Sequence, residues 1–412
     1  MNVPEPVAPG RRVLAPLYAA GFVTAFGAHA VAANLGGYGT KHHTSLWELG
    51  LLLGVYDAAE VVLKPVFGSL SDRIGAKPVL LGGLFAFALA SAAFVVAGQA
   101  HWLGLARFAQ GAAAAAFSPA AGAALASLGG KKRTGRLFGG YGGAKSIGYL
   151  AGPLAGGALV DAGGYSLLFI VLAALAGAVA VLVFWTLPAI PPTPRARSTI
   201  AALARRVTHP SFVQPVLILA VGTAALSAGV GYLPVVGARH HLGPLATGAL
   251  VSLMAATAAL IGPWAGRAHD RASLTPSAGP VALLIAAAGF VTAVIAPNTI
   301  GIAAAALLIG TGIAISTPIA FANLAAAAPD GRLGQTMGAG EVGRELGDAG
   351  GPILVGAFSP VGLGAGLLAL AAAISLGAVT SWRLTASTRR DQPREDTQVT
   401  GDERLVEETR TA

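Results

Sequence analysis

Ionisable side chains inside long apolar runs are the residues of this sequence with the clearest chemical potential. Seven of them form two clusters, each on one face of a predicted helix: Asp57, Glu60 and Lys64 in the run 46–70, and Glu341, Arg344, Glu345 and Asp348 in the run 334–357. A charge at membrane depth is costly, so it persists with a partner, a water-filled cavity or a function. Glu60 and Lys64 are four residues apart, a spacing that favours a salt bridge within the helix. The pattern indicates ion pairing and proton binding.

Composition places the chain among integral membrane proteins. Of its 412 residues 54% are hydrophobic and 11% charged, which is too apolar for a soluble protein of this length. Cysteine is absent, so disulfides, zinc–thiolate sites and thiol catalysis are excluded. The formal charge of +9 could indicate nucleic-acid binding. The positions of the basic residues argue for a membrane topology instead, and no nucleic-acid partner is expected.

Apolar runs of about 20 residues, long enough to cross a bilayer, occur at twelve positions in two groups of six. They lie near 13–35, 46–70, 78–98, 101–127, 137–160, 165–187, 211–235, 244–266, 277–297, 299–324, 334–357 and 360–382. The sequence therefore predicts an all-α membrane protein with two pseudo-symmetric six-helix bundles. The predicted domains are a first bundle at 1–187, a cytoplasmic linker at 188–210, a second bundle at 211–382 and a disordered cytoplasmic tail at 383–412.

The distribution of Lys and Arg predicts the orientation. If the N-terminus is cytoplasmic, 21 of the 27 basic residues lie in cytoplasmic segments, and the outer loops hold only Lys41 and Arg239. This is a strong positive-inside asymmetry. It predicts a multi-pass protein of the bacterial inner membrane, in contact with the lipid bilayer and with both termini in the cytoplasm.

The two halves repeat with an offset near 198 residues. The segment Lys41-His42-His43 corresponds to Arg239-His240-His241, and Gly152-Pro153 corresponds to Gly351-Pro352 after a slip of one residue. The charged face of the run 334–357 has only its basic position in common with the first half, where the counterparts are Gly142, Lys145, Ser146 and Tyr149. Acids confined to one half point to function. Duplicated six-helix halves are typical of transporters that rock around a midplane site.

A glycine-rich charged segment joins the second and third runs, and its residues are Gly68, Leu70, Asp72, Arg73, Gly75, Lys77 and Leu80. Their spacing resembles the signature of the major facilitator superfamily, although Ala76 stands where a basic residue is usual. The simpler alternative is a positive loop that only sets topology. The resemblance implies a conformational switch, in which Asp72 lies beneath the N-terminus of the run 334–357, near Gly334, in the outward-open state.

Two further motifs are similar to those of the same family. Leu103, Arg107, Gln110, Gly111 and Ala113 fit its fourth-helix motif, whose arginine the family implicates in proton transfer. Because an arginine cannot usefully deprotonate, its role would be to hold a carboxylate charged; a purely structural pairing is the alternative. The fifth run resembles the antiporter branch through Gly139, Gly148, Gly152, Pro153, Gly156 and Gly157. Ordinary packing of small residues is the alternative for these glycines.

The family fold implies that the runs 46–70 and 334–357 lie side by side and antiparallel, so a rise of about 1.5 Å per residue gives relative depths. The pairs at matching depth are Lys64 with Glu341, Glu60 with Arg344, and Asp57 with Asp348. Two carboxylates in a low dielectric cannot both stay ionised easily, so Asp57 and Asp348 are the leading hypothesis for the proton site. A static ionic seam is the alternative.

The sequence therefore predicts a secondary transporter, with proton-coupled efflux of drug-like or other small molecules by alternating access. The predicted proton-coupling residues are Asp57, Glu60, Glu341, Glu345, Asp348 and Arg107, with Lys64 and Arg344 as an interdomain charge network. A proton-coupled importer or metabolite exporter, and a non-transporting receptor or scaffold, remain as alternatives. We expect no cofactor and no enzymatic activity, a monomer, protons as the coupling ion, and a largely apolar cavity for a small-molecule substrate.

Overall fold

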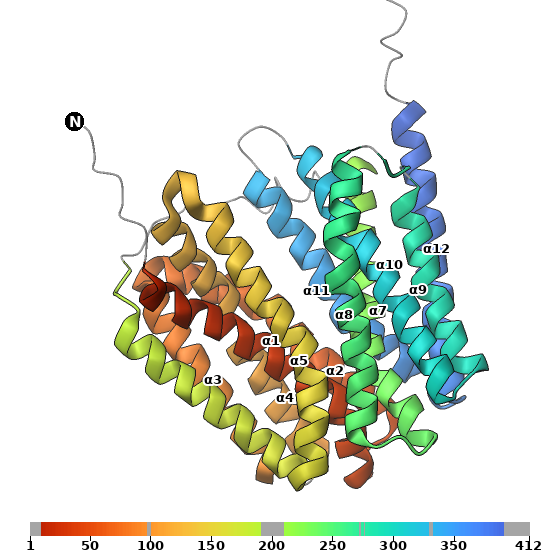
Figure 1. Cartoon of the computed structure of the whole chain (residues 1–412), viewed down its shortest axis with the longest axis horizontal. Coiled ribbons are helices and arrows are strands. Elements are labelled where there is room, and N and C mark those ends of the chain that lie inside the picture. Colours follow the sequence, from red (N-terminus) through yellow and green to blue (C-terminus); the bar gives the residue numbers. More distant parts are fainter. Residues whose placement is uncertain are drawn as a thin grey trace, which may run out of the picture.

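The computed structural model describes residues 10–96, 100–190, 210–271, 273–275, 277–328 and 333–390, and all regular elements in these ranges are helices (Figure 1). The helices are α1 (Arg11–Lys41), α2 (Leu46–Ile74), α3 (Ala76–Val96), α4 (Ala100–Ala114), α5 (Phe117–Thr186), α7 (Pro210–Arg239), α8 (Pro244–Asp270), α9 (Ala278–Ile295), α10 (Thr299–Ala326), α11 (Leu333–Ala357) and α12 (Leu363–Arg390). They form two bundles, as expected.

Helix α5 makes more than one pass. A straight helix of its 70 residues would measure about 105 Å at 1.5 Å per residue, several times the thickness of a bilayer core. Instead the ribbon turns back twice, once before Arg136 and once near Gly164 (Figure 1). Gly164 has φ 74°, a left-handed conformation that glycine adopts without a steric penalty. We call the stretch 136–162 the middle pass of α5.

Twelve passes follow from this folding, which confirms the predicted architecture. Within the described residues, nine helices are long and apolar enough to cross a membrane, and one of these, Arg136–Thr186, passes twice. Helices α2 and α11, of 29 and 25 residues, are also long enough and carry the two charged clusters. The first part of α5 completes the pass that α4 begins, after a turn at Ala115 and Ala116.

Helix ends differ from the sequence boundaries in places. Helix α12 continues to Arg390, so the first residues of the segment predicted as a disordered tail are helical. Helix α7 already begins at Pro210, the last residue of the predicted linker. The stretches 191–209 and 391–412 lie outside the described residues, and the predicted domain boundaries stay predictions.

The backbone repeats where the sequence does. His43 and His241, which are 198 positions apart, both have positive φ values, of 58° and 64°. In each copy the following amide donates to the carbonyl five residues earlier, Thr44 N to Gly39 O at 2.9 Å and Leu242 N to Gly237 O at 3.1 Å. This is a Schellman-type helix end. The duplicated sequence therefore encodes the same stop signal for α1 and for α7.

Close helix packing repeats in the same way. A side chain at Gly148 would collide with the Phe22 carbonyl on α1, and one at Gly347 would collide with the Ala220 carbonyl on α7. Gly152 and Gly351 show the same relation one turn further along, to Phe26 and Ala224. Small residues allow this approach of two backbones in a membrane bundle.

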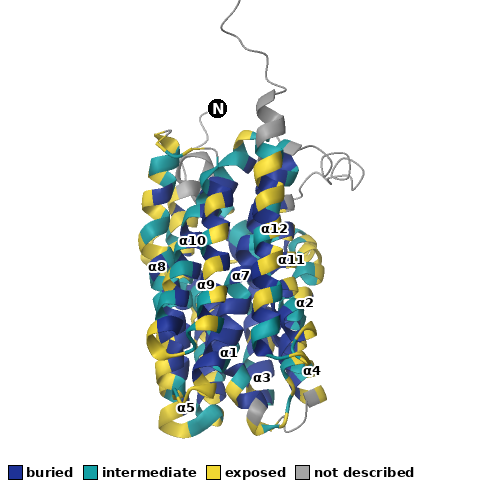
Figure 2. Ribbon diagram, turned by 90° about the vertical axis from the view of Figure 1, so that its right-hand side faces the viewer, coloured by how far each residue is buried: buried dark blue, intermediate teal, exposed yellow. Residues whose placement is uncertain are grey.

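The molecular surface fits a lipid environment. Buried residues concentrate in the middle of the molecule, around α1 and α7, whereas exposed residues line the outer helices (Figure 2). Many exposed positions are large and apolar, for example Phe85, Leu260, Ile300 and Leu376. Exposed apolar side chains over so much of the surface are expected where the solvent is lipid rather than water.

The two bundles meet at one end of the molecule. We call the end with the 42–45 and 240–243 turns the outer end, and the end where α1 begins and α12 finishes the inner end. At the outer end, the Tyr232 hydroxyl on α7 lies 3.0 Å from the Leu46 carbonyl, and Gly54 on α2 packs against Ile353 on α11. The ribbons diverge toward the inner end (Figure 1).

A carboxylate closes the outer end between α5 and α8. Asp161 in the first bundle accepts a hydrogen bond from Leu245 N, at 3.1 Å, in the first turn of α8. Helix α8 has no side-chain cap of its own, because its N-cap residue is Gly243 and Pro244 follows. The carboxylate of Asp161, from the opposite bundle, therefore caps this helix start and complements its positive dipole.

Replacing Asp161 with Ala should favour opening of the outer end. Loss of one such cap costs about 1 kcal/mol, which corresponds to roughly a fivefold change in the ratio of molecules with the outer end open to molecules with it closed. The chain has no cysteine, so spin labels on cysteines introduced at Lys41 and His240 report the width of the outer end specifically. The long-distance population should grow in Asp161→Ala and stay unchanged in Glu48→Gln, whose carboxylate bonds Ser45 N within its own bundle. An unchanged distribution in Asp161→Ala contradicts the cap.

Candidate functional site

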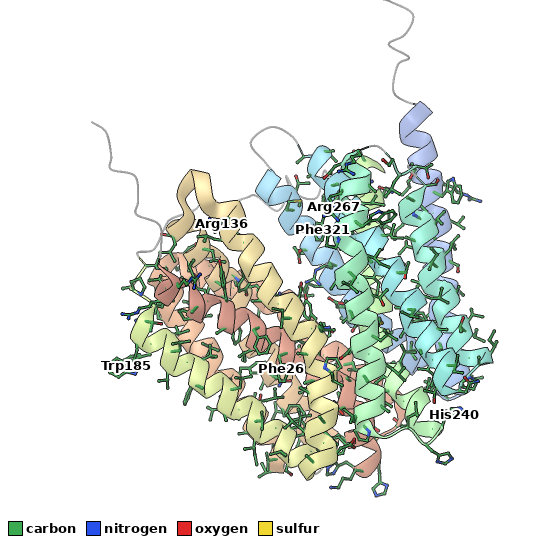
Figure 3. The ribbon with its side chains drawn as sticks, in the orientation of Figure 1. Phe26, Arg136, Trp185, His240, Arg267 and Phe321 are labelled. Atoms are coloured by element: carbon green, nitrogen blue, oxygen red, sulfur yellow. The ribbon has the colours of Figure 1, made fainter. Side chains whose placement is uncertain are left out.

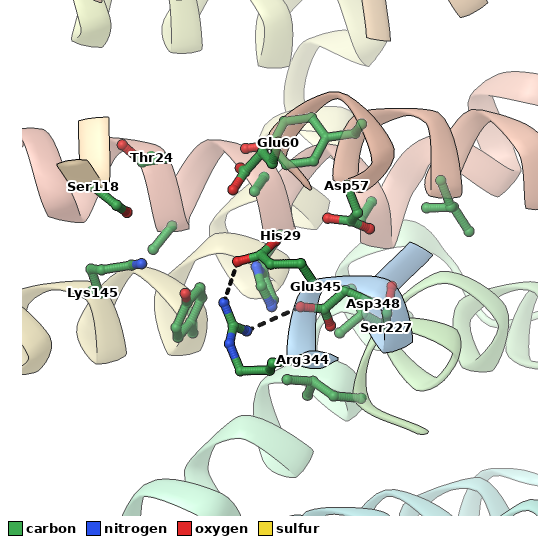
Figure 4. Close-up of a pocket in the computed structure, with 18 of the residues that line it drawn as sticks. Thr24, His29, Asp57, Glu60, Ser118, Lys145, Ser227, Arg344, Glu345 and Asp348 are labelled. Carbon is green, nitrogen blue, oxygen red and sulfur yellow. Dashed lines mark hydrogen bonds and ion pairs between the residues drawn. The ribbon is translucent and has the colours of Figure 1, made fainter. Parts of the chain in front are cut away.

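The two charged clusters predicted from sequence meet in one cavity. Helices α2 and α11 pack closely at the outer end, where a side chain at Gly54 would collide with the Ala349 carbonyl. The helix faces that continue inward from this contact carry the acids and bases. A cavity of about 120 Å³ lies between them, and Asp57, Glu60, Lys64, Arg344, Glu345 and Asp348 all line it (Figure 4).

An ion pair links the two bundles across this cavity. Lys64 Nζ on α2 donates to Glu345 Oε1 on α11 at 2.5 Å, and it also pairs with Glu60 one turn away on its own helix. The side chains of Glu345 and Glu60 are 6% and 11% exposed, so both carboxylates are largely removed from water. Because unpaired charges at this depth are costly, one lysine stabilises two carboxylates from opposite halves.

Arg344 neutralises the acids of its own helix. Its guanidinium donates to Glu341 Oε2 at 2.8 Å, to Glu345 Oε1 at 2.6 Å and to Asp348 Oδ2 at 3.0 Å. Figure 4 shows the bonds to Glu345 and Asp348. The five N–H donors of a planar guanidinium allow this triple contact, which a lysine could not make with the same geometry. Glu341 is the outlying member, with 49% of its side chain exposed.

These pairs differ from those inferred from depth alone. Lys64 contacts Glu345 rather than Glu341, and Arg344 bonds three acids on α11 rather than Glu60. Helical rise gives the position of a residue along the axis, but not the direction in which its side chain points. The predicted bridge from Glu60 to Lys64 within α2 is confirmed.

Arg107 is fixed against the helix turn that carries Asp57. Its Nη1 donates to Gln110 Oε1 at 2.8 Å, and its guanidinium carbon lies 4.1 Å from the centre of the Tyr56 ring. Gln110 is bonded in turn to Ser91 on α3, at 3.2 Å. Arg107 is only 2% exposed, and its Nε has no hydrogen-bond acceptor among the described residues. This buried cation can respond to the charge on Asp57.

Asp57 differs from the other cavity acids because it lacks a partner. No residue of the described part of the chain forms a hydrogen bond or ion pair with its carboxylate, although Glu60, Glu345 and Asp348 are all paired. Asp57 lies across the cavity from Asp348 (Figure 4). An unpaired carboxylate that faces a cavity at membrane depth is a natural place for a proton to bind and leave.

A second, apolar cavity of about 390 Å³ adjoins the charged one. The two share His29, Tyr149, Leu226 and Val230 in their linings, so they lie side by side. The side chains that line the rest of the second cavity come mainly from α8 and α10 and are uncharged: Met254, Ala255, Ala258, Ile313, Thr317 and Phe321 are among them. The expectation of a largely apolar cavity therefore holds for this part only.

The charged segment between α2 and α3 lies at the inner end. Gly75 ends α2 with φ 93°, and its amide donates to Ser71 O at 3.0 Å. Lys77 Nζ donates to Phe184 O at 2.8 Å, in the last turn of α5, where a cation complements the helix dipole. Arg73 is exposed, Asp72 is half-buried, and Gly68 packs near Pro119. The side chains around Gly334 lie outside the described residues.

The glycine motif of α5 serves two interfaces. Gly148, Gly152 and Gly156 face α1 within the first bundle, whereas Gly157 packs on the Pro244 carbonyl of α8 in the second. The Pro153 carbonyl packs against Gly248 on α8, and the Ser252 hydroxyl on α8 donates to Leu150 O at 2.7 Å. Gly139 has open space beside it. The motif therefore shapes both the first bundle and its contact with the second.

Sequence reasoning missed several members of the site. Tyr56 was not predicted, although its ring holds Arg107. His29, deep in α1, lies in the cavity wall with its ring 4.4 Å from that of Tyr149. The repeat alignment already singled out Tyr149 and Lys145 as counterparts of the α11 charges. Among the described residues, His, Asp and Glu do not gather in a set that could hold a metal ion.

Comparison with known proteins gives a consistent assignment. The Major Facilitator Superfamily profile matches residues 17–352. The class H tetracycline resistance protein of Pasteurella multocida is 35% identical over 112 residues, which cover 27% of this chain and 28% of that protein. The methylenomycin A resistance protein of Streptomyces coelicolor is 35% identical over 128 residues, covering 31% and 27%. The matched segments thus span little more than a quarter of either relative.

Solved structures agree with the fold over almost the whole chain. A bacterial homolog of the human lysosomal transporter Spinster, in an inward-facing and unoccupied conformation, has a TM-score of 0.82 at 15% identity, covering 93% of this chain and 98% of that one. A POT family transporter in complex with 5-aminolevulinic acid has a TM-score of 0.75 at 12% identity, covering 91% and 96%. At these identities the likeness concerns the fold.

Replacing Lys64 with Met should destabilise the protein strongly, because it leaves Glu60 without its ion-pair partner. Removing one member of a buried pair costs about 3–5 kcal/mol. We expect the apparent melting temperature in detergent to fall by several degrees and to recover in Lys64→Met/Glu60→Gln. The matched control is Arg73→Met on the same helix, whose side chain is exposed and which should melt like the wild type. Equal melting of Lys64→Met and Arg73→Met contradicts a stabilising bridge.

Proposed function

Because this chain belongs to the Major Facilitator Superfamily, we propose that it is a proton-coupled transporter that exports small organic molecules by alternating access. The observation that carries the proposal is the unpaired carboxylate of Asp57, which faces the central cavity beside the ion pair that joins the two halves. A transporter driven by protons needs an acid that can change its charge at the point where the halves separate.

Asp57 is the primary proton site in this proposal, and Asp348 is the second carboxylate whose like charge acts on it. Asp348 is already bonded to Arg344, at 3.0 Å, so a second negative charge on Asp57 has no equivalent compensation. The two acids line the same cavity from opposite halves. Bringing them together as the halves move favours proton uptake, and separating them favours release.

Arg107 connects the proton to the protein framework. When Asp57 is ionised, Arg107 is attracted toward the helix turn of Tyr56 and Asp57, against which it is already packed. When Asp57 is protonated, that attraction ends, and Arg107 keeps its hydrogen bond to Gln110 and its contact with the Tyr56 ring. Arg107 itself stays charged throughout, so it acts by holding the charge of Asp57 and not by carrying the proton.

The bridge from Lys64 to Glu345 lets the halves move relative to each other. Glu345 Oε1 accepts from both Lys64 and Arg344, and Lys64 has Glu60 as a second partner within its own helix. Either side of the bridge therefore keeps one partner if the contact between α2 and α11 breaks. An exchange of ion pairs costs less than leaving a charge bare, which suits a rocking interface.

The divergence of the two bundles toward the inner end supports a conformation that is open at that end (Figure 1). If that end is cytoplasmic, as the basic residues predict, the described state is inward-open. Closing the inner end would bring the charged segment of Asp72 toward the start of α11. There the carboxylate would meet the positive end of a helix dipole, in a contact worth about 0.3–1 kcal/mol. This contact at the inner end would be the counterpart of Asp161 and α8 at the outer end.

Export is favoured over import by two features. The relatives that match over part of the chain are named as resistance proteins. The glycine motif of α5, which resembles that of the antiporter branch, packs on α8 at the contact between the two bundles. A proton-coupled importer or metabolite exporter on the same fold is the alternative, and flux measured in both directions across proteoliposomes separates the two. A receptor or scaffold would show no flux that depends on protons. We further propose that the protein acts as a monomer.

Asp57→Asn should abolish uphill transport, whereas exchange of substrate across the membrane in the absence of a pH gradient should persist. Asparagine keeps the size of the side chain and cannot exchange a proton, so a pH gradient across proteoliposomes no longer drives accumulation. Glu48→Gln removes a carboxylate of the same helix outside the cavity and should transport like the wild type. If Asp57→Asn and Asp348→Asn both still transport uphill, the proton is carried by another residue, and Glu345 and Glu60 are the next candidates.

The inner end should face the cytoplasm. Arg136 and Arg267 lie at the inner end and His240 at the outer end (Figure 3). Cysteines introduced at Arg267 and Arg239 should therefore be labelled from opposite sides by a reagent that does not cross membranes. In intact cells the cysteine at 239 should react and that at 267 should react only after lysis. Reaction of both in intact cells contradicts the orientation.

A further inference from the structure

Lys145 is a cavity cation with no direct ion-pair partner among the described residues. It extends from the middle pass of α5 into the charged cavity (Figure 4). No residue of the described part of the chain forms a hydrogen bond or ion pair with its ammonium group, and its only close contact of note is the Tyr149 ring, whose centre lies 5.8 Å from Nζ. By contrast, Lys64 has two carboxylate partners and Arg344 has three.

The internal repeat shows that this lack of acids is specific to the first half. Lys145 is the counterpart of Arg344, and the glycines that follow them, Gly148 and Gly347, pack on equivalent carbonyls of α1 and α7. The three acids that bond Arg344 are replaced around Lys145 by Gly142, Ser146 and Tyr149. The scaffold therefore repeats a basic position and omits its counter-ions in one copy.

An unpaired ammonium group in a cavity at membrane depth has a strong preference for an anion. Within the described ranges its charge lacks a direct hydrogen-bond acceptor, so a ligand that brings a carboxylate gains a charge-assisted hydrogen bond. The free acid Asp57 does not serve this purpose, since it is not within ion-pair distance of Lys145. The uncharged polar side chains that line this cavity together with Lys145 include Ser118, Thr24, His29 and Tyr149 (Figure 4).

The adjoining cavity fits the remainder of such a ligand. It begins at His29 and Tyr149, continues along α8 and α10, and has no charged residue in its lining. Its volume of about 390 Å³ is in the range of small-molecule sites, which combine an apolar wall with a few polar groups. Met254 and Phe321 provide a flexible and an aromatic surface for a flat apolar body.

We infer that the cavity takes an organic anion, with a single carboxylate-type group held by Lys145 and an apolar body lying between α8 and α10. The inference rests on the proposed role of this cavity as the transport site, but not on the direction in which protons move. It names a substrate class: amphipathic organic acids, in preference to neutral or cationic molecules of the same size.

A matched ligand series tests the charge preference directly. The probes are 2-naphthoate, 2-naphthamide and 2-naphthylmethylamine, which share one ring system and are anionic, neutral and cationic at pH 7. Binding to the purified full-length protein is measured by calorimetry at equal pH, without a membrane gradient. We expect 2-naphthoate to bind at least tenfold more tightly than either of the other two.

Substitution of Lys145 locates the effect. Lys145→Gln should bind 2-naphthoate and 2-naphthamide within about threefold of each other, whereas Lys145→Arg should keep the preference for the anion. Lys41→Gln is the matched control: this lysine is exposed at the outer end and its loss should leave all three affinities unchanged. Thermal melting of each variant shows that a lost preference is not a loss of folding.

Several outcomes overturn the inference. They are equal or tighter binding of the amide or the amine by the wild type, no binding of any of the three probes, and an anion preference that persists in folded Lys145→Gln. The proposed function fails separately, because it depends on flux under a pH gradient and on Asp57. A protein that prefers 2-naphthoate through Lys145 but moves no substrate with protons would refute only the proton-coupled transport.

Discussion

The cost of holding charge away from water is the constraint on which this structure depends. Four carboxylates and four Lys or Arg side chains line one cavity between helices that are otherwise apolar. Most of them are paired, and the pairs determine how α2 and α11 face each other. Lys64 and Glu345 join the halves because each would be expensive alone. Among the described residues, Asp57, Arg107 and Lys145 have no ion-pair partner, and Arg107 is held instead by Gln110 and the Tyr56 ring. Asp57 and Lys145 are therefore the positions where we propose that a proton and a ligand bind.

The scaffold that carries these charges is duplicated, and the same kind of close helix packing holds each half together. Glycines at equivalent positions of α5 and α11 let each helix approach the backbone of α1 or α7. Without a hydrophobic driving force between helices in lipid, such close packing supplies much of the cohesion. The contacts between the bundles gather at the outer end, an arrangement that suits the rigid-body motion that we propose for the inner end.

The sequence was sufficient for the architecture because its signals are strong and local. Runs of apolar residues, the distribution of Lys and Arg and the repeat near 198 residues predict twelve passes in two halves. The clusters on α2 and α11 were also predicted to meet. Their pairing was not, because axial rise cannot tell that Glu345, not Glu341, points at Lys64. Tyr56 and the lining of α8 and α10 were missed because an aromatic or an alanine in an apolar helix has no distinguishing pattern.

The charges break the symmetry that the backbone keeps. On the first half, the cavity face has the acids Asp57 and Glu60 against Lys64, Arg107 and Lys145, a surplus of one positive charge. On the second half, Arg344, Glu345 and Asp348 line the cavity, a surplus of one negative charge, and Glu341 adds a second negative charge outside the lining. The halves therefore attract each other across the cavity. Protonation of an acid on the second half weakens that attraction, whereas protonation of Asp57 strengthens it. In the mechanism that we propose, the side of the cavity that takes the proton would therefore decide whether the inner end tends to open or to close.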